Sequence, residues 1–279
     1  MGTATGYDSA VNTTIDVSPD DGVGRSSGIE WRRVAEIGST NDALLAEGFG
    51  AAPRGPIVLR ADRQVAGRGR RGRRWVSDPQ GALTFSIALE RRAGGGTAPL
   101  AGFSLAVGIA LAESLVGMVP DIRVKWPNDL VRGNGKAGGI LVETRREGGV
   151  ERVVAGIGLN LRRPPDIDDA QGPMDALVPV GLFDTVVPID ADELMRPCAL
   201  AVWVAFEDFV SHGLAAFAER WRQFDAVAGR PVVLRDATNE IARGMALGID
   251  AQGALRIRDA QGERAYSVGE VSMRFDATG

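Results

Sequence analysis

Residues 136–161 read KAGGILVETRREGGVERVVAGIGLNL and contain two β-type runs, 136–144 and 150–161. The segment Glu147-Gly148-Gly149 separates them and is a hairpin signal, because glycine gives the backbone the freedom that a tight antiparallel turn needs. We therefore expect the two runs to pair as neighbouring strands. They place a mixed or antiparallel sheet at the centre of the chain.

The sequence on either side of this hairpin supplies further strands and helices. Strands are expected at residues 29–37, 56–61, 83–89 and 122–126. Helices are expected at residues 100–118, 190–210 and 213–224. Pro197 should interrupt the first turns of the 190–210 helix, and the capping box Ser39-Thr40-Asn41-Asp42 should open a further one. The chain thus has the pattern of an α+β fold, with a mixed sheet flanked by helices.

The two ends of the chain differ from this central part. Residues 1–28 are rich in Ser, Thr, Gly and Asp without periodicity, which predicts a disordered tail. Beyond Gly229, short β runs are separated by Gly and Asp, a pattern typical of a small β-barrel domain of about 50 residues. We expect the tail at 1–28, a main domain at 29–227 and a small domain at 228–279.

Composition excludes several classes of site. The chain has 279 residues, a net charge of −4, one cysteine and one histidine, Cys198 and His212. An internal disulfide and a Cys/His zinc cluster are therefore excluded. The chain shows no secretory signal pattern and no uninterrupted apolar run of about 20 residues, so we expect a cytoplasmic protein without a membrane span.

The sequence GRGRRGRRW, residues 67–75, holds five arginines among three glycines in this acidic chain. Because glycine has no side chain, its backbone amides can approach an anion closely. The planar guanidinium groups of arginine can donate two hydrogen bonds to phosphate and carboxylate oxygens. The spacing matches GxGxxG, but a strand and not a helix is expected to follow, so a dinucleotide fold is excluded. A solvated loop that binds RNA nonspecifically is the alternative interpretation.

A second cluster surrounds the turn KWPND, residues 125–129. Asn128 and Asp129 should project together at a strand end, where they would meet a metal–phosphate group; a simple turn-forming role explains the pair equally well. Lys136 opens a strand of small residues, which leaves room for an acidic ligand beside its ammonium group. Without that context, a surface lysine would be the default interpretation.

Taken together, these motifs resemble the biotin–protein ligases. The motifs that carry the resemblance, in order, are Ser39-Thr40-Asn41, Gln64 before the arginine loop, KWPND, KAGGILVE at residues 136–143, and GIGLN at residues 156–160. The resemblance runs from about residue 31 to the C-terminus. It implies a class II synthetase-like catalytic domain followed by an SH3-like barrel. It also implies ATP and biotin as substrates with Mg²⁺, a biotinyl-5′-AMP intermediate, and transfer to a lysine of a biotin carboxyl carrier domain.

The resemblance also implies roles for individual residues. The expected catalytic residues are Lys136, Arg68 and Asp129. The expected biotin-binding residues are Ser39, Thr40, Asn41, Gln64, Gly67, Arg68, Gly69, Arg70 and Lys136. The expected nucleotide-binding residues are Arg70, Arg73, Trp75, Asn128 and Asn160. Asp129 is expected either to bind the metal or to act as the base for the incoming lysine, and the glycine-rich arginine loop is expected to act as a lid.

The resemblance also bears on partners, and two rival functions are considered beside it. Family members that repress transcription carry an N-terminal helix-turn-helix domain, and residues 1–28 lack its length and periodicity, so specific DNA binding is not expected. A homodimer is one option for the assembly. The rival functions are a lipoate or octanoate–protein ligase or transferase of related fold, and a nucleic-acid-binding protein that uses the arginine loop.

Overall fold

The computed structural model describes residues 28–76, 78–94, 100–164, 177–184, 187–236, 239–267 and 272–275. The expected tail, residues 1–27 of it, lies outside the described residues. The elements in chain order are β1 (Glu30–Ile37), α1 (Thr40–Ala46), β2 (Ile57–Gln64), η1 (Arg70–Gly72), β3 (Ala82–Arg92), α2 (Phe103–Leu115), β4 (Ile122–Lys125), β5 (Asp129–Arg132), β6 (Gly135–Glu147), β7 (Val150–Asn160), α3 (Ala191–His212), η2 (Gly213–Phe217), α4 (Ala218–Phe224), β8 (Pro231–Arg235), β9 (Glu240–Ile249), β10 (Leu255–Asp259), β11 (Gly262–Tyr266) and β12 (Ser272–Phe275).

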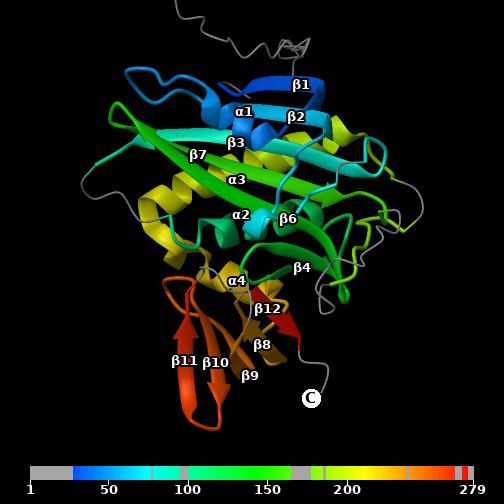
Figure 1. Cartoon of the computed structure of the whole chain (residues 1–279), viewed down its shortest axis with the longest axis vertical. Helices are drawn as coiled ribbons and strands as arrows, with labels where there is room; N and C mark the ends of the chain where they lie inside the picture. Colours follow the sequence, from blue (N-terminus) through cyan, green and yellow to red (C-terminus); the bar gives the residue numbers. More distant parts are fainter. Residues whose placement is uncertain are drawn as a thin grey trace, which may run out of the picture.

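A seven-stranded sheet with the order β1-β2-β3-β7-β6-β5-β4 forms the larger part of the molecule (Figure 1). β1 pairs with β2 in parallel, and every other neighbouring pair is antiparallel. The predicted mixed sheet is therefore confirmed, with the β6–β7 hairpin at its centre. The sequence patterns missed the four-residue strand β5.

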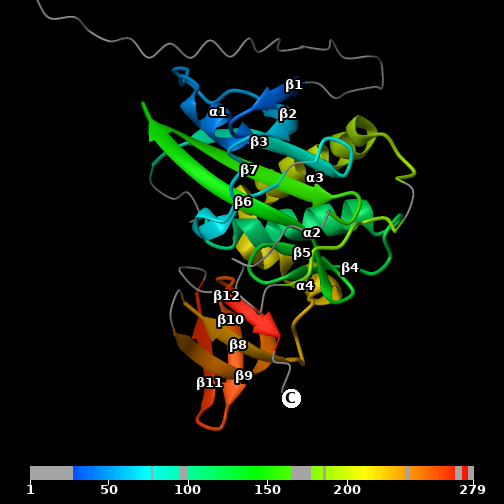
Figure 2. The same ribbon diagram turned by 45° about the vertical axis from the view of Figure 1, so that its right-hand side comes forward.

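The two faces of this sheet have different roles, which follow from the two-residue period of a strand. On β3, Leu83, Phe85 and Ile87 point into the main hydrophobic core, while the alternate residues Thr84 and Ser86 lie on the opposite face. α2 and α3 pack against the core face, behind the sheet in Figure 2. α1 packs over part of the opposite face, next to β7, β3 and β2. The part of this second face that α1 leaves uncovered is the part that carries the polar residues.

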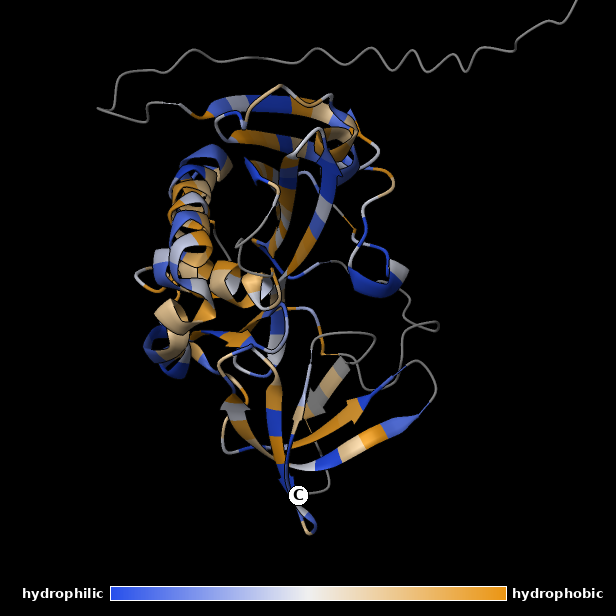
Figure 3. Ribbon diagram, turned by 90° about the vertical axis from the view of Figure 1, so that its left-hand side faces the viewer, coloured by the Kyte–Doolittle hydropathy of each residue, from blue (hydrophilic) through white to orange (hydrophobic). Residues whose placement is uncertain are grey.

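The long helix α3 begins at the N-cap Asp190, whose side chain accepts a hydrogen bond from the Asp192 amide. The expectation that Pro197 would interrupt the helix is wrong, because α3 runs through Pro197 to His212. Burial of a continuous face, including Cys198 and Phe206, outweighs the cost of one lost backbone hydrogen bond. In Figure 3 this helix carries hydrophilic and hydrophobic residues side by side, as expected of a helix with one buried face.

The helical stretch that follows α3 is divided more finely than the sequence predicted. The expected helix at 213–224 consists of the 3₁₀ turn η2 and the short helix α4.

By length and composition alone, Ala191–Phe224 would be long and apolar enough to cross a membrane. In the structure this stretch comprises three elements, and its apolar side packs into the protein core.

The C-terminal strands form a separate five-stranded antiparallel sheet with the order β11-β10-β9-β8-β12 (Figure 2). Four β runs were predicted here, and the short returning strand β12 was missed. The indole Nε1 of Trp126, on the turn after β4, donates a buried hydrogen bond of 3.0 Å to the Gly253 carbonyl between β9 and β10. The KWPND turn is thereby joined to the C-terminal sheet.

Candidate active site

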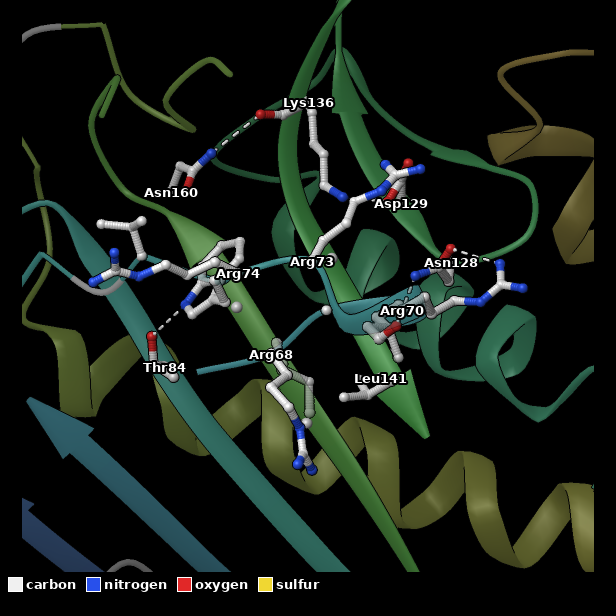
Figure 4. A pocket seen from close by; sticks show the side chains of 18 of the residues that line it. Arg68, Arg70, Arg73, Arg74, Thr84, Asn128, Asp129, Lys136, Leu141 and Asn160 are labelled. Carbon is white, nitrogen blue, oxygen red and sulfur yellow. Dashed lines mark hydrogen bonds and ion pairs between the residues drawn. The ribbon is translucent and has the colours of Figure 1, made fainter. Parts of the chain in front are cut away.

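A cavity of about 820 Å³ lies between the polar face of the large sheet and the arginine loop. Figure 4 shows this cavity with side chains from the loop, from β3 and from β5, β6 and β7 around it. Of the residues that the sequence predicted for the site, those lining the cavity are Ser39, Thr40, Asn41, Gln64, Arg68, Gly69, Arg70, Arg73, Trp75, Asn128, Asp129, Lys136 and Asn160. The structure therefore brings residues from five separate motifs to one place.

Gly67 is the one predicted site residue that does not line the cavity, and it lies directly behind the wall. Its carbonyl accepts a 2.9 Å hydrogen bond from the Trp75 amide, which closes the base of the loop. A Cβ at this position would lie 2.8 Å from Gln64 Nε2 and 2.9 Å from the Trp75 carbonyl oxygen. A side chain would therefore push Gln64 and Trp75 away from the cavity, which explains the need for glycine.

A hydrogen-bonded chain of side chains occupies the end of the cavity nearest α1. Gln64 Oε1 accepts from the Thr40 amide at 2.7 Å, and Thr40 Oγ1 lies 2.6 Å from Ser86 Oγ. Ser86 Oγ donates to Asn41 Oδ1 at 2.6 Å, and Asn41 Nδ2 donates to Glu143 Oε2 at 2.8 Å. These contacts fix the orientation of each amide and hydroxyl, so this end of the cavity presents a preorganised set of donors and acceptors.

Two glycines of β7 make room for this arrangement. A Cβ at Gly156 would overlap the Asn41 side chain, and one at Gly158 would overlap the Trp75 ring. Because the two positions are two residues apart, they lie on the same face of the sheet. The GIG sequence thus lets Asn41 and Trp75 lie directly on the backbone. Trp75 is fixed further by its indole Nε1, which donates to Thr84 Oγ1 at 3.1 Å.

α1 carries two residues of this hydrogen-bonded series of side chains, Thr40 and Asn41, and other residues hold the helix at both ends. Ser39 is its N-cap and accepts from the Asp42 amide at 3.3 Å, as the capping box predicted. At the other end, the fully buried Arg152 of β7 donates to the carbonyls of Leu44, Glu47 and Gly48 at 2.7–3.0 Å. A short helix of seven residues is marginal alone, so these contacts keep its first turn in position at the cavity.

Asp129 lies between two lysines at the opposite end of the cavity. Lys136 Nζ donates to its Oδ1 at 2.6 Å, and Lys125 Nζ lies 3.5 Å from its Oδ2. Burial alone would raise the pKa of Asp129, but the charges of Lys136 and Lys125 lower this pKa to about 2. Asp129 is therefore a carboxylate at neutral pH, and the two ammonium groups are held around it.

Asn128 and Asn160 have structural partners within the same wall. Asn128 Nδ2 donates to the Ile140 carbonyl at 2.8 Å, while its Oδ1 accepts from Arg70 at 3.3 Å. Asn160 Nδ2 donates to the Lys136 carbonyl at 3.2 Å (Figure 4). The turn-forming role and the site role of Asn128 are thus compatible, because one side chain holds β6 and also reaches the loop.

The arginine loop contains the short 3₁₀ turn η1 and lies over the cavity. Within it, Arg71 adopts φ 61° and ψ 31°, a left-handed conformation that is uncommon outside glycine. Burial and the neighbouring Arg71 and Arg73 charges lower the pKa of Arg70, while Asp129 acts in the opposite sense. Arg68 points away from Lys136 in Figure 4 and pairs with Asp42 and Glu143. This concentration of like charge favours an anionic ligand beneath the loop.

Comparison with known proteins identifies the family. Residues 34–160 match the model of the biotin/lipoate A/B protein ligase family, and residues 227–274 match the biotin protein ligase C-terminal domain. The chain is 37% identical over 242 residues to the bifunctional ligase/repressor BirA of Escherichia coli, covering 85% of this chain and 72% of that protein. The chain belongs to the biotin protein ligase family.

Two further relatives agree with this assignment. A biotin–[acetyl-CoA-carboxylase] ligase of Paracoccus denitrificans is 36% identical over 240 residues, which cover 82% of this chain and 96% of that protein. A biotin protein ligase from Aquifex aeolicus, solved in complex with biotin and ATP, superposes with a TM-score of 0.71 at 23% identity, covering 90% of this chain and all of that one. At that identity the superposition supports the fold, a ligase domain followed by a small C-terminal sheet.

Sequence reasoning missed several residues of this ligase site. Lys125 is almost fully buried beside Asp129, and Ser86 and Glu143 complete the chain at α1. Each lies two residues from a residue that lines the cavity, namely Pro127, Thr84 and Leu141 respectively. That alternation was the available signal, but it becomes informative only once the face that α1 and the loop cover is known.

Proposed function

We propose that this chain catalyses the ATP-dependent attachment of biotin to a lysine of a biotin-dependent carboxylase. The observation that carries the proposal is the meeting of Lys136, Asp129 and the arginine loop around one cavity whose other end is a preorganised polar pocket. One end suits a small polar head group, and the cationic end suits a carboxylate and a phosphate chain. Biotin and ATP are the substrates, and biotinyl-5′-AMP is the intermediate.

In the first step, a biotin carboxylate oxygen attacks the α-phosphorus of ATP. The new oxygen–phosphorus bond forms as the bond to the β-phosphate oxygen breaks, and diphosphate leaves with the electron pair. Two anions must approach each other, so fixed cations reduce their repulsion and stabilise the charge that develops. Lys136 and Arg68 are the residues to which we assign this role, with Arg68 leaving its pairing with Asp42 and Glu143 when the ligands bind. Asp129 holds Lys136 in position.

In the second step, a neutral lysine amine of the acceptor attacks the biotinyl carbonyl carbon. An amide bond forms, the bond from the acyl carbon to the phosphate oxygen breaks, and AMP leaves. The amine must lose a proton. The low pKa of Asp129, about 2, makes it a weak base. This favours a role for Asp129 in holding Lys136 and Lys125 over a role as the proton acceptor.

The donor set around Asp129 does not fit a protein-held magnesium ion. Both of its oxygens face ammonium groups. Across the described ranges, no group of three or more His, Cys, Asp or Glu side chains is placed to hold a metal ion. We therefore assign Mg²⁺ to the phosphate oxygens of ATP, which commonly serve as ligands of this ion together with water. We derive no protein step through it.

The remaining assignments are those that the family resemblance implies, and all of these residues except Gly67 line the cavity. The biotin head group binds among Ser39, Thr40, Asn41 and Gln64, and the loop residues Gly67, Arg68, Gly69 and Arg70 close over biotin and the adenylate linkage. Arg70, Arg73, Trp75, Asn128 and Asn160 contact the nucleotide. The catalytic domain spans residues 29–227 and the C-terminal SH3-like domain residues 228–279.

The acceptor is a biotin carboxyl carrier domain, and the protein acts in the cytoplasm without specific DNA binding; a homodimer is compatible with this function. The C-terminal match is to a biotin protein ligase domain, which favours biotin over lipoate or octanoate. Incubation with biotin and α-³²P-labelled ATP should give a tightly held biotinyl-AMP, which a biotin carrier domain discharges. Formation of lipoyl-AMP in preference, or salt-sensitive oligonucleotide binding without any adenylate, would contradict the proposal.

A further inference from the structure

We propose that the cations around this cavity prevent the ligase from acylating itself, because nearly all of them are arginines and not accessible lysines. The inference rests on the proposed function, because biotinyl-5′-AMP is a mixed anhydride that reacts with amines. In that unwanted reaction, an amine nitrogen bonds to the biotinyl carbonyl carbon and loses its proton to solvent, while AMP leaves with the electron pair of the broken carbon–oxygen bond. Any accessible lysine near the intermediate is a target.

Lysine is almost absent from this chain. Its 279 residues include only two lysines, Lys125 and Lys136, and both lie at the cavity. The side chain of Lys125 is only 2% exposed. Lys136 is 31% exposed, and its Nζ donates a hydrogen bond of 2.6 Å to the Asp129 carboxylate. One lysine is thus shielded by burial, and the Nζ of the other is engaged in a salt bridge with Asp129.

The arginine loop supplies all its positive charge without an amine. Arg71, Arg73 and Arg74 are exposed and line the cavity beside the place proposed for the intermediate. A guanidinium is planar, delocalised and permanently protonated, so it binds carboxylate and phosphate oxygens but is not a nucleophile at neutral pH. A lysine at the same positions would bring an amine to the intermediate at high effective concentration. Arginine therefore provides the anion binding without the side reaction.

Conservative replacements in the loop test this directly. Arg71→Lys and Arg74→Lys each keep the charge and add one amine at the cavity, whereas Arg222→Lys adds one on the exposed surface of α4 as the matched control. Each protein is incubated with biotin, ATP and Mg²⁺ without acceptor, and covalent biotin is measured by intact mass and peptide mapping, which separates the α-amino group. Diphosphate release in the same samples reports whether the intermediate forms.

We expect wild type and R222K to remain unmodified at side chains, and R71K or R74K to gain at least about tenfold more covalent biotin, at the introduced lysine. The inference is overturned if neither loop variant is labelled above wild type while diphosphate is released. It is also overturned if R222K is labelled as strongly as the loop variants, because released intermediate would then be the acylating species. Absence of diphosphate release from wild type would instead refute the proposed function.

Discussion

At the scale of single residues, we expect adenylation to depend most on the positive charge of Lys136. It is the more exposed of the two lysines that Asp129 holds at the cavity wall, and it is placed to meet an incoming carboxylate and phosphate. Lys136→Ala should lower biotin-dependent diphosphate release by about 100-fold, the usual effect of losing one preorganised transition-state contact. Arg123 of β4 donates to the backbone carbonyls of Pro120 and Ile122 and does not line the cavity, so Arg123→Ala should retain activity. Normal diphosphate release by the Lys136 variant would refute its role.

Asp129 gives a pH dependence whose sign follows from its environment. Lys136 and Lys125 lower the pKa of Asp129 to about 2, below its ordinary value of 3.8. The ionised carboxylate therefore stabilises the folded state above pH 4, and this contribution disappears as the pH falls toward 2. Asp129→Asn should cost about 2 kcal/mol of unfolding free energy at pH 6, and the difference from wild type should shrink at pH 3. Urea titrations at the two pH values measure it; a difference that grows on acidification would contradict the assignment.

At the scale of elements, Gly158 of β7 lets the Trp75 ring pack directly against the strand at the cavity. Gly158→Ala would place a Cβ in the Trp75 ring and push that ring toward the cavity. We expect the dissociation constant for ATP to rise about tenfold, with biotin affected less because its proposed pocket lies beside α1. Calorimetric titration with each ligand measures the two effects. Gly117→Ala is the control, because a Cβ there meets no atom within 4 Å, and equal losses for both ligands would argue for general misfolding.

The arginine loop should behave as a lid whose order depends on ligands. Its backbone structure consists of η1 and one antiparallel bridge between Arg68 and Arg74, and its exposed arginines repel each other unless an anion lies between them. Biotin with ATP should therefore slow tryptic cleavage within residues 68–74 strongly, and biotin alone should slow it less. Mass spectrometry of the early fragments identifies the cut sites. Cleavage in the loop at an unchanged rate would count against a lid.

At the scale of the whole molecule, Trp126 couples the two sheets through its hydrogen bond to the Gly253 carbonyl. Trp126→Phe keeps the ring packing but leaves that buried carbonyl without its donor, which should cost about 1–3 kcal/mol and lower the melting temperature in calorimetry. Trp203→Phe is the matched control, since its indole bonds to Glu207 at the surface. If the Trp126 and Trp203 variants lose equal stability, the interdomain bond does not contribute as we expect.

The sequence by itself determined most of the elements and the chemical character of the site. The β6–β7 hairpin, the capping box at Ser39 and the arginine loop between two strands were predicted because turns, caps and alternation are local properties of the chain. The ordered motifs likewise predicted thirteen of the residues that line the cavity.

Only the tertiary structure decided which side chains meet. The hydrogen-bonded series of side chains from Thr40 to Glu143 and the continuation of α3 through Pro197 depend on contacts between segments far apart in sequence. The pairing of Asp129 with both lysines, four and seven residues away, depends on how β4, β5 and β6 pair. Packing energy and the local electric field come from those contacts, so no local pattern contains them.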